Sequence, residues 1–209
     1  MWLSIKALCI AGLGLLAVTS HAASQPVPSP DVKISRAVDT VEALHTQLAA
    51  LMQSVATDLD ERKDLIGPTL AQTFDLPAMT KAIYGSRNWR GLDPAQQDAA
   101  IQTFTQWMTT QYARRFTSSS EPNFLTGETR DGGLSTVIVE TQLRTPNTTV
   151  NLDYRTRVVD GDVKIIDIYL DGRVSEVALR RSEFRDTIKT AGLDGFIAAL
   201  DAKTQALAQ

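Results

Sequence analysis

Few residues of the chain are of a type that could serve as a catalytic nucleophile or base. The 209 residues include two histidines, His21 and His45, and one cysteine, Cys9. Cys9 and His21 belong to an N-terminal segment that we expect to be removed, so a Ser-His-Asp or Cys-His site would depend on His45 alone. His45 falls on the apolar face of a predicted helix, where a structural role in the core is the more common one. We therefore interpret His45 as structural.

Three aspartates, Asp153, Asp167 and Asp171, fall on or near adjacent predicted strands. Two carboxylates in one pocket could perform acid–base chemistry. The alternative, which we favour, is that they are exposed strand residues or turn formers, with Asp171-Gly172 forming a turn. The sequence contains no Gly-x-Ser-x-Gly elbow, phosphate-binding loop or His/Cys metal spacing. It therefore predicts a protein that is not an enzyme and that uses neither a metal nor a cofactor.

Two arginine pairs, Arg114-Arg115 and Arg180-Arg181, could bind a lipid phosphate. Paired arginines on helix faces are more often solvated, and this is the interpretation that we favour. Four aromatic residues could line a ligand cavity or belong to the core, and the sequence leaves both open: Tyr84, Trp89, Trp107 and Tyr112.

Residues 1–22 are typical of a secretory signal peptide. Lys6 provides the positive charge, residues 7–18 form an apolar run, and Ser20-His21-Ala22 offers small residues at the two positions that a signal peptidase recognises. The apolar run is shorter than the roughly 20 residues that a membrane-spanning helix needs. We expect export to the periplasm and cleavage after Ala22, followed by a Pro/Ser linker over residues 23–30 and one domain over residues 31–209.

Cleavage would remove Lys6, the one charged residue of the signal, and change the net charge from −3 to −4. Nucleic-acid binding requires a basic face, so we expect no nucleic-acid partner. The same charge argues against an anionic membrane surface as the primary ligand. The mature chain would contain no cysteine, so its core alone must stabilise it.

Residues 123–172 predict an antiparallel meander of four strands. The runs cover residues 123–133, 134–146, 147–161 and 162–172, with turn signals at Asp131-Gly132-Gly133, Pro146-Asn147 and Asp160-Gly161. Asp-Gly is the strongest hairpin signal because glycine accepts the positive φ angle of a tight turn. The third run alternates between apolar or β-branched and polar residues, as a half-buried antiparallel strand does.

A long amphipathic helix is predicted before the sheet. Apolar residues recur at intervals of three and four over residues 34–59, with Asp31 as the N-cap, so one face can pack on the sheet. A coiled coil is the alternative, but packing within a globular domain is the more common use of a single such stretch. Gly67-Pro68 is expected to break the chain, and a short helix follows, capped by Asp75 and ending at Gly85.

The remaining helices flank the meander. Asp93-Pro94 and Gln96 form a capping box that starts a helix with an aromatic-rich face, and two further helices after the sheet are separated by Gly192, the second capped by Asp194. The sequence therefore predicts an α+β domain, a four-stranded antiparallel curved sheet with helices packed on one side.

Three segments carry a family resemblance: FDLPAMTKAIYGSRNW at 74–89, DVKIIDIYLDGRVSEVALRRSEF at 162–184 and GLDGFIAAL at 192–200. Together they resemble the MlaC family, the toluene-tolerance auxiliary component of an ABC lipid transporter, over nearly all of residues 34–200. The matching positions are Phe74, Asp75, Met79, Gly85, Trp89, Lys164, Asp167, Gly172, Arg181, Ser182, Phe184, Gly192, Asp194 and Gly195. Residues 169–184 are more similar to the hopanoid-associated branch, HpnM, than to MlaC proper.

The resemblance implies a periplasmic carrier whose NTF2-like cone encloses the acyl chains of a lipid in an apolar cavity. The ligand would be a phospholipid or a hopanoid, and the partners an inner-membrane ABC lipid transporter and an outer-membrane lipoprotein complex. The inward phase of the predicted elements selects the cavity lining, with the phase of the fourth strand left open: Phe74, Met79, Ile83, Trp89, Phe104, Met108, Tyr112, Val137, Val139, Leu152, Tyr154, Ile166, Ile168 and Val174.

Two other functions remain open at the level of the sequence. A periplasmic adapter that carries no lipid would have a tightly packed core without a cavity. An NTF2-like enzyme would need Asp153 or Asp167 to point into the cavity with a raised pKa. Asp153 falls on the polar phase of its strand, which argues against the enzyme, and we favour the carrier.

Overall fold

The computed structural model describes residues 30–56, 58–117, 122–146 and 148–209. The predicted signal peptide (1–22) and linker (23–30) lie outside the described residues, except for Pro30, at which the first helix begins. Among the described residues, no helix combines the length and the apolar composition that crossing a membrane would take.

The described residues form helices and one antiparallel sheet, which confirms the predicted α+β class. The elements in chain order are α1 (Pro30–Gln53), α2 (Leu59–Thr73), α3 (Leu76–Tyr84), α4 (Ser86–Trp89), α5 (Pro94–Arg115), β1 (Asn123–Gly133), β2 (Thr136–Thr145), β3 (Thr148–Val159), β4 (Asp162–Leu170), β5 (Val174–Ser175) and α6 (Glu176–Ala208). The strands lie in sequence order, as a meander requires.

The sheet has five strands within the described residues, so the prediction of four strands is wrong by one. β5 pairs with the end of β4 through Ser175 and Tyr169. Asp171 and Gly172, with φ angles of 50° and 65°, turn the chain back between these two strands. A strand of two residues is too short to show an alternating pattern, so nothing in the sequence predicts it.

Two hairpin turns can be compared with their predicted positions. Asp160 and Gly161 have φ angles of 49° and 90° and connect β3 to β4, as predicted. The turn between β1 and β2 lies at Leu134 and Ser135, with φ angles of 51° and 61°, rather than at residues 131–133. β1 continues through both glycines: Gly133 still pairs with Thr136 of β2, and Gly132 lies at the register shift between Asp131 and Gly133.

The predicted helix over residues 34–59 is two helices in the structure. α1 ends at Gln53, and Asp58 starts the next helix by accepting hydrogen bonds from the backbone N–H groups of Asp60 and Glu61 (2.8 and 3.2 Å). An apolar repeat does not reveal such an interruption, because both helices use the same spacing.

The break predicted at Gly67-Pro68 is also wrong, since this pair lies inside α2. Proline disfavours the helical conformation of the preceding residue through contact with its Cβ atom, which Gly67 lacks. Burial of Ile66 and Leu70 on the core side of α2 favours the helix in addition.

A buried arginine joins the ends of α1, α2 and α5. Arg62 donates hydrogen bonds to the carbonyl oxygens of Leu51 (3.2 Å), Ala56 (3.2 Å), Ala113 (2.9 Å) and Phe116 (2.5 Å). The last carbonyls of a helix have no partner within it, and a cation there also opposes the negative end of the helix dipole. Arg62 thereby fixes the C-terminal end of α5.

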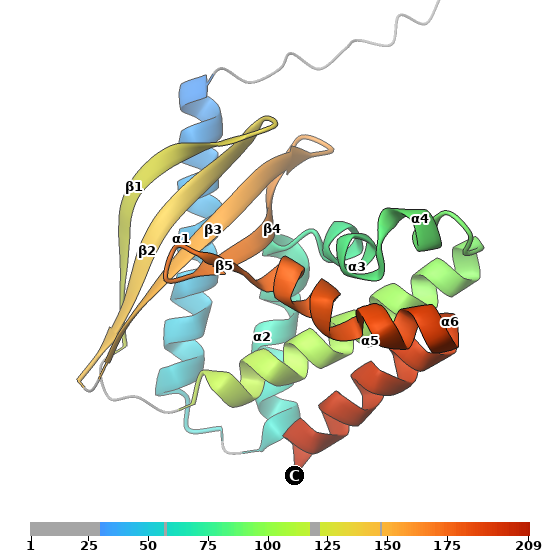
Figure 1. Cartoon of the computed structure of the whole chain (residues 1–209). Helices are drawn as coiled ribbons and strands as arrows, with labels where there is room; N and C mark the ends of the chain where they lie inside the picture. Colours follow the sequence, from blue (N-terminus) through green and yellow to red (C-terminus); the bar gives the residue numbers. More distant parts are fainter. Residues whose placement is uncertain (1–29, 57, 118–121, 147) are drawn as a thin grey trace, which may run out of the picture.

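The helices lie on one face of the curved sheet, which we call the inner face (Figure 1). α1 packs along this face against β1 to β4 and buries Val41, Leu44 and Leu48 completely. α2, α3 and α6 each contact β4, and α5 packs against these three helices. Tyr154 of β3 belongs to the same core and shows that the inner face carries the apolar side of the alternation.

Candidate functional site

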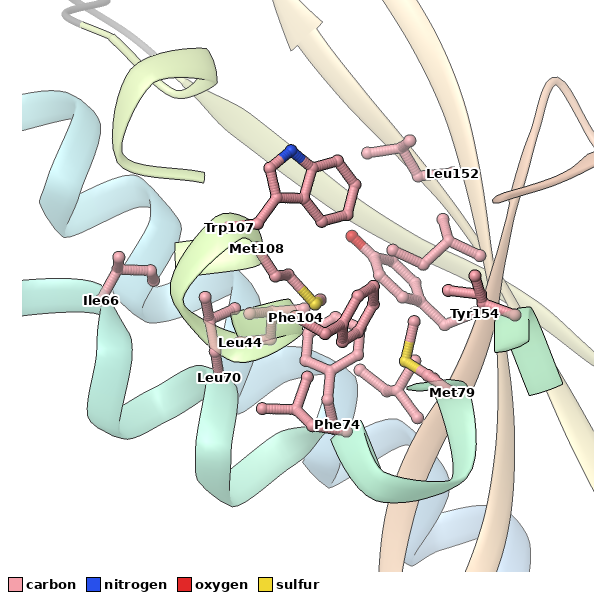
Figure 2. Close-up of a cluster of buried hydrophobic side chains, with 14 of the residues drawn as sticks. Leu44, Ile66, Leu70, Phe74, Met79, Phe104, Trp107, Met108, Leu152 and Tyr154 are labelled. Carbon is pink, nitrogen blue, oxygen red and sulfur yellow. The ribbon is translucent and has the colours of Figure 1, made fainter. Parts of the chain in front are cut away.

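A pocket of about 580 Å³ opens between the inner face of the sheet and helices α3, α5 and α6. The described residues that line it are Met52, Met79, Ile83, Phe104, Trp107, Met108, Gln111, Tyr112, Arg115, Phe116, Thr117, Leu143, Thr145, Pro146, Thr148, Val150, Leu152, Tyr154, Ile168, Leu170, Glu176, Val177 and Arg180. Figure 2 shows Met79, Phe104 and Tyr154 converging from α3, α5 and β3.

Regular spacing explains how the sequence places so many side chains in one pocket. On α5 the lining residues recur at alternating intervals of three and one between Phe104 and Arg115, which keeps them on one face of the helix. On β3 every second residue from Thr148 to Tyr154 lines the pocket, because alternate side chains share one face of a sheet. One helix face and one strand face thus form the two main walls.

Eight of the fourteen residues selected from the sequence line this pocket. They are Met79, Ile83, Phe104, Met108, Tyr112, Leu152, Tyr154 and Ile168. Six others do not: Phe74, Trp89, Val137, Val139, Ile166 and Val174.

Two of the six are core residues of the helical region. The ring of Phe74 lies edge-on to Tyr112, with 5.9 Å between centroids, so it supports a lining residue from behind. Trp89 packs edge-on against Tyr84 at 6.1 Å. Both are nearly fully buried, but they fill the core and do not contact the pocket.

The other four lie on strands. Val139 is fully buried beside Tyr154 on the inner face of β2, and Val137 is half-buried on the same face. Ile166 lies where the pairing of β3 with β4 shifts register, which changes the phase of β4 and puts Ile165 and Ile168 on the inner face. Val174 is 47% exposed on the short edge strand β5.

Sequence reasoning missed several lining residues that the same periodicities contain. The spacing of α5 that selects Phe104 and Met108 also selects Gln111 and Arg115, and the alternation of β3 also selects Thr148 and Val150. Gln111, Arg115 and Thr148 were missed because a purely apolar cavity was expected, whereas polar side chains form part of this lining. For Trp107 the sequence left open whether it lines a cavity or belongs to the core, and in the structure it lines the pocket.

The pocket is apolar at its inner end and polar at its rim. Met79, Phe104 and Tyr154 are at most 3% exposed. Arg115 and Thr148, by contrast, are exposed residues at the end of α5 and the start of β3. Such a gradient suits a ligand with an apolar body and a polar end.

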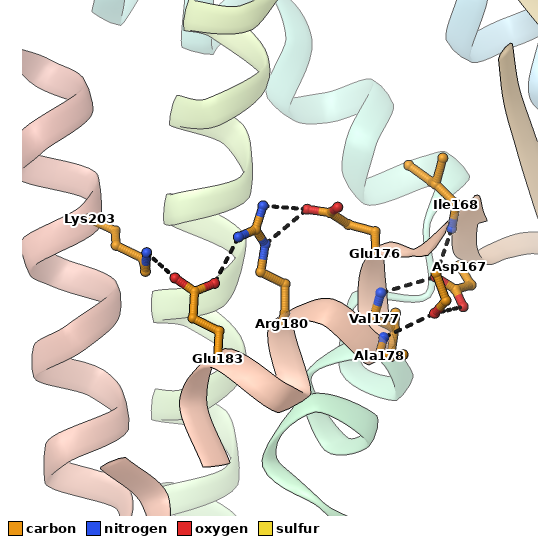
Figure 3. Close-up of polar contacts among 9 residues, drawn as sticks. Asp167, Ile168, Glu176, Val177, Ala178, Arg180, Glu183 and Lys203 are labelled. Carbon is orange, nitrogen blue, oxygen red and sulfur yellow. Dashed lines mark hydrogen bonds and ion pairs between the residues drawn. The ribbon is translucent and has the colours of Figure 1, made fainter. Parts of the chain in front are cut away.

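An ion-pair cluster forms the rim on the side of α6 (Figure 3). Arg180 donates hydrogen bonds to Glu176 (2.6 and 2.9 Å) and to Glu183 (2.7 Å), and its guanidinium lies 5.2 Å from the ring centroid of Trp107. Lys203 pairs with Glu183 from the far end of α6. Both carboxylates and both cations therefore have partners, so the cluster is close to neutral.

The two aspartates that an enzyme would use are outside the pocket lining. Asp167 accepts hydrogen bonds from Ser175 Oγ (2.6 Å) and from the backbone N–H groups of Ile168 (2.9 Å) and Val177 (3.1 Å), so it holds the start of α6 (Figure 3). Asp153 faces away from the inner face, 3.5 Å from Arg130. Burial raises the pKa of Asp153, but its side chain lies on the face of β3 opposite the pocket.

His45 is buried between α1 and the sheet. Its Nε2 atom is 3.2 Å from the hydroxyl of Tyr154, and its ring stacks on Phe124 with 4.4 Å between centroids. Burial lowers the pKa of His45 to about 4, so the ring is neutral at pH 7. These contacts agree with a structural role, and they hold Tyr154 at the inner end of the pocket.

The family model of the MlaC protein matches residues 39–202, from α1 into the second half of α6. The chain belongs to the MlaC family. The fold is similar to a solved structure from Ralstonia solanacearum, described as a phospholipid-binding protein in complex with a phospholipid. The TM-score is 0.69, with 22% sequence identity over 85% of this chain and 98% of the other. None of the curated proteins matches the sequence significantly.

In this MlaC family member the pocket has the features of a binding site. Glu176 is the one carboxylate among the described lining residues, and it is paired with Arg180, so no second carboxylate accompanies it. Across the described residues, no group of His, Cys, Asp and Glu side chains has the arrangement of a metal site. The MlaC pocket can therefore bury an apolar ligand and meet a polar group at its rim.

Proposed function

We propose that this MlaC family protein is a periplasmic carrier that binds a phospholipid in the pocket between β3 and α5. The observation that carries the proposal is the pocket of about 580 Å³, with an apolar inner end and a polar rim. The fold-related Ralstonia solanacearum protein, described as phospholipid-binding, supports the choice of ligand. The volume lies within the range of roughly 300–1,000 Å³ that is usual for ligand pockets.

The energetics of acyl chains favour a carrier of this design. A chain of about 16 methylenes gains on the order of 13 kcal/mol when it leaves water, at about 0.8 kcal/mol per CH₂ group. A pocket is needed to provide this, because an exposed patch buries only part of the chain. The bilayer offers a similar gain, so the free-energy difference between carrier and membrane is small and transfer can run in either direction.

The proposal includes export by the predicted signal peptide and enclosure of the acyl chains in an NTF2-like cone. Its partners are an inner-membrane ABC lipid transporter and an outer-membrane lipoprotein complex, between which the lipid is carried. A rigid hopanoid-type lipid is the second candidate cargo, favoured by the resemblance of residues 169–184 to HpnM and by the aromatic walls at Phe104, Trp107 and Tyr112. The pocket disfavours an adapter with a filled core.

The test is a pair of variants on neighbouring residues of β3. Leu152→Arg places a charge in the pocket, whereas Asn151→Arg places the same charge on the exposed opposite face. An unpaired charge in an apolar site costs several kcal/mol. We expect Leu152→Arg to lower phospholipid uptake from vesicles at least tenfold and Asn151→Arg to leave it unchanged.

Circular dichroism at the temperature of the assay checks that both variants are folded. If Leu152→Arg is unfolded, Leu152→Trp replaces it and fills the pocket without adding a charge. A folded pocket variant that takes up phospholipid as well as the wild type would contradict the proposed function.

A further inference from the structure

The charged residues that line the pocket determine whether it can bind the phosphate group of a lipid. Of the described lining residues, three are charged: Arg115, Glu176 and Arg180. Glu176 and Arg180 bind each other, and Glu183 binds Arg180 in addition. The guanidinium of Arg180 also covers the ring of Trp107. Arg180 is therefore committed to holding α6 against α5 and is not free to bind a ligand anion.

Arg115 is in a different situation. It is the last residue of α5, it is exposed, and it lines the pocket. No carboxylate within the described ranges, which leave out residues 118–121, forms an ion pair with it. Its charge acts on the pocket: burial raises the pKa of the lining residue Tyr112, and the charge of Arg115 opposes that rise.

The rim of the pocket also carries neutral polar groups. The lining residues Thr117 and Thr148 carry hydroxyl groups and are exposed, as Arg115 is. Arg62 fixes the backbone from which Arg115 projects, by hydrogen bonds to Ala113 and Phe116 on either side of it. The cation thus stands on an ordered helix end and not on a loose loop.

We propose that Arg115 binds the phosphate of the lipid headgroup and gives the pocket a preference for phosphate-bearing lipids over phosphate-free lipids with the same acyl chains. The inference rests on the proposed function, because the acyl chains must occupy the inner end of the pocket. The planar guanidinium can donate two parallel hydrogen bonds to phosphate oxygens. Burial of the acyl chains at the apolar inner end gives the affinity, and Arg115 determines which headgroup is preferred.

The neighbouring Arg114 provides a matched control. It is also exposed and at the end of α5, but its Nε atom donates to the carbonyl of Leu207 in α6, and it does not line the pocket. Arg114→Gln and Arg115→Gln therefore remove the same charge from the same helix end, and only the second removes it from the rim.

The experiment is a competition read by native mass spectrometry. Delipidated full-length mature protein is incubated with mixed vesicles containing equal amounts of dipalmitoyl phosphatidylglycerol and dipalmitoylglycerol, and the ratio of the two bound species is measured. The phosphatidylglycerol-to-diacylglycerol ratio of each variant is divided by that of the wild type, which cancels differences in extraction from the vesicle. We expect about a fivefold lower ratio for Arg115→Gln and no change for Arg114→Gln.

An unchanged ratio for Arg115→Gln, or an equal fall for Arg114→Gln, would overturn the inference while the proposed function stands. Wild-type protein that binds neither lipid would instead overturn the proposed function itself. Calorimetry with inorganic phosphate and lipid-free protein separates the two sources of a phosphate group. We expect no measurable heat of binding for inorganic phosphate. If free phosphate binds tightly and Arg115→Gln abolishes that binding, the assignment of Arg115 to a lipid headgroup is overturned.

Discussion

At the scale of single residues, His45 links the core to the pocket. Its neutral ring contacts the hydroxyl of Tyr154, and Tyr154 lines the inner end of the pocket. A protonated His45 would be buried as a charge beside the ring of Phe124. The structure therefore requires the neutral form.

This requirement makes stability depend on pH. Burial lowers the pKa of His45 from 6.5 to about 4, so the unfolded chain takes up the proton first as the pH falls. The free energy of unfolding should fall between pH 6.5 and pH 4, by about 3 kcal/mol from this residue. Denaturant unfolding of the wild type and of His45→Gln at a series of pH values measures the effect. Over this pH range the glutamine variant, which cannot titrate, should lose about 3 kcal/mol less of its free energy of unfolding than the wild type. If the free energies of unfolding of the two proteins fall in parallel with pH, the assignment to His45 is refuted.

Single residues were predicted best where one physical rule applied. The caps Asp75 and Asp93 were identified correctly, because a carboxylate before Pro at the first helical turn has few other uses. Arg62 was missed, since nothing in its local sequence distinguishes a buried arginine from a solvated one. Ile166 was misplaced as a lining residue because a register shift between two strands leaves no trace in either.

At the scale of elements, α6 is two helical segments joined at Gly192, as the sequence predicted. Gly192 has φ 59° and ψ −141°, and the rings of Phe184 and Phe196 meet across the bend with 5.1 Å between centroids. Glu183 and Lys203 also connect the two segments. The bend places the first segment, with Glu176 and Arg180, at the pocket rim.

Gly192→Ala tests the bend. No atom lies within 4 Å of the position that a Cβ atom would occupy, so the substitution costs backbone strain and not a steric clash. We expect a loss of about 1–3 kcal/mol in the free energy of unfolding, because residues with a side chain avoid this conformation. Chemical denaturation measures it. Lys189→Ala, an exposed change in the same helix, should stay within about 0.5 kcal/mol, and equal stability of both variants would argue against a required bend.

At the scale of the whole molecule, the α+β class and the meander followed from hydrophobic periodicity and turn residues alone. The pocket did not, because its position depends on how α5 approaches β3. That approach is set by the contacts of α5 with α2, α3 and α6, which in turn contact β4 and lie far apart in the sequence. Periodicity identified the faces of α5 and β3 that line the pocket. It could not distinguish the residues that line the pocket from the buried core residues behind them.

The central claim is that the protein carries a phospholipid in this pocket. The most direct measurement is native mass spectrometry of protein purified from the periplasm without detergent, followed by organic extraction of the bound material. We predict a mass increase that matches one phospholipid and that disappears on extraction, whereas a bound hopanoid would support the HpnM branch. Protein that is empty and that also takes up no lipid from vesicles would contradict the carrier.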